Sequence, residues 1–143
     1  MNNSNLKREM LRHTVATLAY RGAKAVRDAH DSFGSFRVSE TTRTPIQILA
    51  HISDLLDWAL SIAKGAETWH ISTPVSLNQE IERFHTALTS LDEYLASDGQ
   101  LGGTCEHLFQ GPIADSLTHV GQLTMLRGMA GAPIRGENYS LAK

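Results

Sequence analysis

The fold is decided by the stretch from Thr44 to Gly65, which reads TPIQILAHISDLLDWALSIAKG. Thr44 is a helix N-cap candidate, and Pro45 stands at the first helical position, where its missing amide proton leaves no bond unmade. Lys64 and Gly65 supply a basic last turn and a glycine stop. Apolar residues recur between them at steps of three and four, which predicts an amphipathic helix with one broad core-facing stripe. The stripe consists of Ile48, Leu49, Ile52, Leu55, Leu56, Ala59 and Ile62.

Three other segments have the same helical periodicity. The first covers about 5–28 and ends in a turn-prone loop. Another covers 76–97 and starts with Ser76 and Gln79, which match a capping box. The last covers about 111–131, from a Gly-Pro pair to a glycine stop. No segment alternates as a strand would, so we expect an all-α four-helix bundle in a single domain covering residues 1–143.

Composition excludes several classes of function. The chain has 13 basic and 15 acidic side chains and a net charge of -2, so it lacks the basic surplus of a nucleic-acid-binding protein. Its single cysteine, Cys105, excludes an internal disulfide and a multi-cysteine zinc site. We find no signal-peptide pattern and no apolar run near the ~20 residues of a membrane span. We therefore expect a cytoplasmic protein with no nucleic-acid or membrane partner.

The histidines suggest a metal site between the second and fourth predicted helices. His51 lies on the apolar stripe, where a histidine is either a hydrogen-bonded core residue or a ligand. Asp115 and His119 are four residues apart and project from one helix face, which is chelating geometry. The alternatives for this pair are a surface hydrogen bond, or a helix-start carboxylate favoured by the macrodipole. Together the three side chains could hold one ion and leave coordination positions open, as in catalytic sites.

Other residues make weaker ligand sets. His13 and His85 lie on mixed faces of the first and third helices, and His30 and His70 lie in predicted loops. The cluster at 105–107, Cys-Glu-His, could approach the mouth of the site, but we interpret it as an exposed loop.

Several segments resemble the DinB-like (YfiT-like) family. Residues 43–52 and 55–58 resemble the second helix of these proteins, and residues 114–123, continuing to Gly131, resemble the fourth. With the stretch 18–21 of the first helix, the resemblance spans nearly the whole chain. It implies a bundle of up-down-down-up order, which the long connections between the predicted helices allow.

The same resemblance implies a divalent metal site. The family typically uses one histidine on helix two and two histidines, four residues apart, on helix four. His51 and His119 match two of these positions, and Asp115 stands where the other histidine usually lies. A carboxylate shifts the preference toward manganese or ferrous iron, while zinc and nickel stay open.

The function that we expect is that of a divalent-metal-dependent enzyme acting on an unassigned small molecule. Relatives of the fold include thiol-dependent transferases and isomerases, so a small-thiol-dependent transferase or a hydrolase is implied. A metal would lower the pKa of a bound water or thiol. The catalytic residues beyond the ligands are unassigned. Arg127 and Arg135 are candidates for attracting an anionic substrate, the alternative being solvated helix-end or tail charges.

Two other hypotheses concern the role of the whole molecule. The first is a non-enzymatic stress-response or binding module with an empty or degenerate metal site, and the aspartate at position 115 motivates it. The second is a homodimer, which family members often form, with Trp58 and Trp69 as candidate interface anchors. Core packing is the alternative explanation for Trp58.

Overall fold

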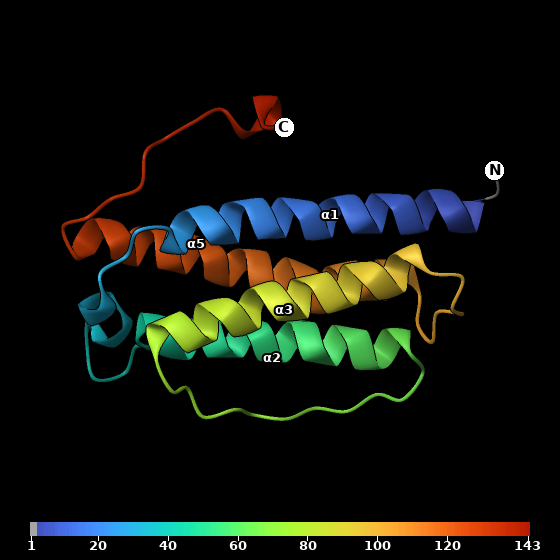
Figure 1. Cartoon of the computed structure of the whole chain (residues 1–143), viewed down its shortest axis with the longest axis horizontal. Coiled ribbons are helices and arrows are strands. Elements are labelled where there is room, and N and C mark those ends of the chain that lie inside the picture. The colour runs from blue at the N-terminus through green and yellow to red at the C-terminus, as the bar shows by residue number, and fades with distance from the viewer. Residues whose placement is uncertain (1–2) are drawn as a thin grey trace.

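The computed structural model describes residues 3–143 as a bundle of four long helices (Figure 1). No strand occurs among these residues, and the predicted all-α four-helix bundle is confirmed. The long helices are α1 (Asn3–Val26), α2 (Pro45–Ala63), α3 (Leu77–Ala96) and α5 (Ala114–Met129).

The connections explain the directions of the helices. α1 and α5 run in one direction, while α2 and α3 run in the other (Figure 1). Segment 64–76 leaves the end of α2 and returns along the bundle to the start of α3, so these neighbouring helices are parallel. The α1–α2 connection contains one short helix, η1 (Asp31–Ser35), and α4 (Cys105–Leu108) follows α3.

The core lies where the apolar stripes of the four helices meet. At one point α1 approaches α3 closely, because Gly22 packs on the ring of Phe84. A Cβ atom at position 22 would lie only 2.8 Å from Phe84 Cε2. The largest fully buried side chains of the bundle include Phe84, Leu18, Leu49, Ile52, Leu56, Leu91 and Leu123.

The helix starts follow the predicted caps, with one difference. Thr44 forms a complete capping box with Gln47, in which Thr44 N donates to Gln47 Oε1 at 2.9 Å and Gln47 N donates to Thr44 Oγ1. Ser76 accepts a bond from Gln79 N, but the Gln79 side chain does not return one. The predicted capping box at Ser76 is therefore only half formed.

The chain becomes helical at Cys105, before the start at about residue 111 that the sequence predicts for the last helix. Residues 105–107 begin α4, so their assignment to a loop is wrong. One turn of π-helix, η2 (Phe109–Ile113), then joins α4 to α5 and contains Pro112. A proline inside an α-helix removes a bond and clashes with the preceding turn, and the wider turn accommodates it. Leu108 and Ile113 anchor this stretch in the core.

α2 is the one described helix that is long and apolar enough to cross a membrane by length and composition alone. More than half of its most apolar window is buried inside the bundle, as in the core helix of a globular domain. The packing of α2 against α3 and α5 therefore explains why this helix is so apolar.

The carboxyl-terminal segment 132–143 turns back alongside α1 (Figure 1). Glu137 accepts hydrogen bonds from Lys24 Nζ, at 2.7 Å, and from the Tyr20 hydroxyl. The Tyr139 ring lies 4.2 Å from the Arg21 guanidinium. These contacts hold the segment on the outer face of α1, away from α2.

Candidate metal centre

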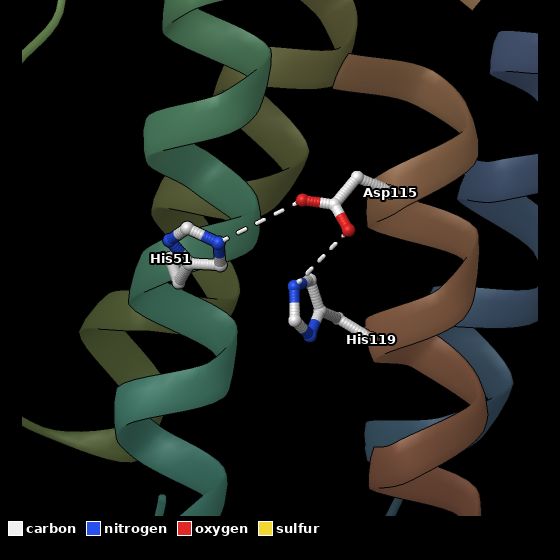
Figure 2. A group of neighbouring side chains, drawn as sticks. All are labelled: His51, Asp115 and His119. Carbon is white, nitrogen blue, oxygen red and sulfur yellow. Dashed lines mark ion pairs between the residues drawn. The ribbon is translucent and has the colours of Figure 1, made fainter. Parts of the chain in front are cut away.

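His51, Asp115 and His119 come together between α2 and α5 (Figure 2). His51 projects from α2, and the other two side chains project from α5 toward it. The Asp115 carboxylate lies near both imidazoles, with its Oδ2 3.9 Å from His51 Nε2 and its Oδ1 3.5 Å from His119 Nε2. The centroids of the two imidazole rings are 4.8 Å apart and the rings are nearly perpendicular.

The three side chains contact one another at ion-pair distances, without hydrogen bonds among them (Figure 2). Both nitrogen–oxygen distances exceed the 2.7–3.2 Å of an ordinary hydrogen bond. Within the part of the chain that the structure describes, neither the His51 ring nor the Asp115 carboxylate makes a hydrogen bond. The expectation of an Asp–His hydrogen bond on the helix surface therefore does not account for the pair on α5.

The separations are close to those of ligands around one ion. Nitrogen and oxygen ligands about 2.1 Å from a tetrahedral ion lie about 3.4 Å from one another. The Asp115–His119 pair is at 3.5 Å, and all three ligand atoms lie within 4.8 Å of one another. Asp115 is half exposed, so its carboxylate can rotate to shorten the contact with His51. The donor set therefore fits a divalent cation after small side-chain movements.

Gln122 orients the ring of His119. His119 Nδ1 lies 2.8 Å from Gln122 Oε1, one turn further along α5. An amide oxygen only accepts, so His119 Nδ1–H is the donor of this contact, and Nε2 is the ring nitrogen that faces Asp115. Metal-bound histidines commonly donate their other ring N–H to an acceptor of this kind.

The pKa of His51 is lowered from its ordinary value. The main cause is burial, followed by the positive charge of Arg43 and the neighbouring His119, whereas Asp115 acts in the opposite direction. The neutral imidazole is the form that binds a metal ion. The surroundings of His51 therefore favour the protonation state that a ligand needs.

Two tryptophans, Trp58 and Trp69, lie next to His51. The Trp69 ring lies edge-on to His51, with centroids 6.1 Å apart, and edge-on to Trp58 at 5.8 Å. Trp58 Nε1 donates to Glu67 Oε2 at 3.3 Å, which ties segment 64–76 to α2. Both tryptophan rings therefore contact other side chains of the same chain.

The other sequence candidates lie outside this cluster. His13, His30 and His85 are exposed. Cys105 is half-buried near Lys7 and Arg8 of α1, and burial raises the pKa of its thiol. It therefore faces α1 rather than the mouth of the metal centre.

Arg127 neither faces a substrate site nor lies in solvent, which were the two roles predicted for it. Its side chain is buried and donates to the backbone carbonyls of Ala25, Arg27 and Ala132. It caps the carboxyl end of α1, where unpaired carbonyls carry a partial negative charge. The interpretations of Arg127 as a substrate-attracting residue and as a solvated charge are both wrong.

A second polar cluster, which the sequence did not reveal, fastens segment 64–76 to the bundle. Arg83 Nη2 on α3 donates to Asp54 Oδ1 at 2.6 Å and to Asp57 Oδ2 at 2.9 Å. His70 Nε2 lies 3.4 Å from an oxygen of each carboxylate, and Ser72 N donates to Asp54 Oδ2.

The Arg83 guanidinium already occupies the position of a cation between these two carboxylates. Burial alone would raise the pKa of Asp54, but the hydrogen bonds from Arg83 and Ser72 outweigh it and lower that pKa. One signal of this cluster was visible in the sequence, since Asp54 interrupts the apolar stripe of α2 and a buried carboxylate requires a partner. Nothing in the sequence identified the partner as Arg83.

Comparisons with protein-family models, curated proteins and solved structures find no match for this chain.

Proposed function

We propose that the chain binds one divalent metal ion through His51, Asp115 and His119 and acts as a metal-dependent enzyme on a small molecule. The observation that supports the proposal is the convergence of two imidazoles and a carboxylate that make no hydrogen bonds with one another. The Asp115 carboxylate approaches both rings only at ion-pair distances, and a shared cation would bond to all three groups at once.

The donor set is that of an open site. Two neutral imidazoles and one carboxylate leave further coordination positions for water or substrate. When bound, a divalent ion supplies a nucleophile near neutral pH by lowering the pKa of a coordinated water or thiol, which suits a small-thiol-dependent transferase or a hydrolase. Asp115 provides one negative charge, and Gln122 holds the ring of His119 in place. Zinc, nickel, manganese and ferrous iron are the candidate ions.

Metal analysis tests this proposal. We expect protein purified without chelator to contain one equivalent of a divalent metal, measured by inductively coupled plasma mass spectrometry. The variants His51→Ala and His119→Ala should lose it. The control variant His85→Ala changes an exposed histidine on α3 and should retain it.

A wild-type protein that is free of metal and binds none of the four ions on titration would refute the metal site. In that case the bundle would act as a non-enzymatic stress-response or binding module with an empty site.

A further inference from the structure

An apolar pocket lies beside the metal centre, between α2, α5 and the loop before α2. It encloses about 550 Å³, which is within the range of about 300–1,000 Å³ typical of small-molecule sites. Its apolar lining includes Val38, Ile48, Met125 and Met129, and Arg43 and Gln122 are among its polar residues.

The pocket and the metal centre share structural elements. Gln122 lines the pocket and also holds the ring of His119. Ile48 lies one turn before His51 on α2, and Arg43 is close enough for its charge to act on His51. A molecule in the pocket would therefore present one end to the metal centre.

Arg43 is a cation without an acidic partner. It is exposed, and within residues 3–143 it makes no hydrogen bond or ion pair. A divalent ion at the metal centre would add two positive charges, of which Asp115 balances one. The polar end of the pocket therefore attracts an anion, and the planar fork of the Arg43 guanidinium can pair with a carboxylate through two parallel hydrogen bonds.

The apolar end is suited to a flexible or irregular group. Met125 and Met129 are both more than half exposed, although large apolar side chains are usually covered. Methionine side chains adapt to the shape of an apolar ligand because they are unbranched and have several rotatable bonds. A ligand in the pocket would cover these two side chains.

We propose that the pocket binds a small organic carboxylate, whose apolar body lies against Met125 and Met129 and whose carboxylate pairs with Arg43. This inference names the substrate class of the proposed metal enzyme and so rests on that function.

Calorimetric titration of the zinc-saturated full chain with octanoate and with 1-octanol tests the inference. The two probes have the same chain length and differ in charge. We expect octanoate to bind with one-to-one stoichiometry and Arg43→Gln to weaken it about tenfold, the effect of losing one charge-assisted bond. The affinity for 1-octanol should change less than about twofold, within the usual variation of an exposed substitution.

Two further variants complete the test. Met125→Glu places a negative charge in the pocket and should weaken both probes, while the control Arg135→Gln, which changes an exposed arginine of the tail, should weaken neither. Absence of saturable octanoate binding would overturn the inference. Equal weakening of both probes by Arg43→Gln, or no effect of Met125→Glu, would also overturn it.

The same titrations, repeated after treatment with a chelator and paired with a zinc titration, separate this inference from the proposed function. Zinc binding without octanoate binding would overturn the carboxylate pocket alone. Octanoate binding that depends on Arg43, in a chain that binds no metal, would overturn the metal enzyme alone.

Discussion

Arg127→Met removes the side chain that caps the carboxyl end of α1. Arg127 is 6% exposed and donates to the carbonyl oxygens of Ala25, Arg27 and Ala132 at 2.9, 3.0 and 3.1 Å. Methionine fills most of the same volume, so little of the loss comes from a cavity. The loss comes from carbonyls left without a donor, which cost about 1–3 kcal/mol each when buried. We expect the free energy of unfolding to fall by about 3 kcal/mol.

Urea unfolding followed by circular dichroism measures this loss. For a chain of this size the same change should lower the midpoint of thermal unfolding by about 10 °C. The control Arg135→Met alters an exposed arginine of the tail and should change stability by less than about 0.5 kcal/mol. If Arg127→Met were no more destabilising than this control, the capping role of Arg127 would be refuted.

Three other predictions concern packing, pH and assembly. Gly22→Ala should cost about 1–3 kcal/mol in urea unfolding because its Cβ would overlap the ring of Phe84, and an unchanged midpoint would contradict that packing. Asp54 binds its proton less tightly in the folded than in the unfolded chain, so its stabilising contribution is complete above about pH 4 and is lost as the pH falls through the folded-state pKa. Asp54→Asn should therefore flatten the loss of stability below pH 4, and an unaltered slope would show that the contacts with Arg83 and its neighbours do not lower that pKa. Finally, we propose a homodimer with the exposed Trp69 in its interface, and sedimentation as a monomer at high micromolar concentration would exclude it.

The long helices could be predicted because their signals are local. α2 starts at Pro45 after the Thr44 cap and ends at Ala63, followed by Lys64 as the C-cap and by Gly65 with a positive φ of 81°, as the sequence indicates. The stretch before α5 could not be predicted in the same way. Its glycines and Pro112 are typical of a chain break, but the π-helical turn lets the backbone pass through Pro112.

Long-range partners explain the remaining differences. The spacing of Asp115 and His119 is a property of one helix, and it predicts a shared face. Their approach to His51 depends on how α2 and α5 pack, and this packing cannot be predicted from the periodicity of either helix alone. Likewise, Arg127 meets carbonyls about 100 residues earlier in the chain, so its burial is a consequence of the bundle alone.

Anomalous diffraction from crystals grown with a divalent metal tests the central claim most directly. Data collected on either side of the absorption edge of the bound ion would identify the element and its ligands together. We expect one peak about 2.1 Å from His51 Nε2, His119 Nε2 and an oxygen of Asp115. A peak elsewhere in the bundle, or none between α2 and α5, would contradict the metal centre.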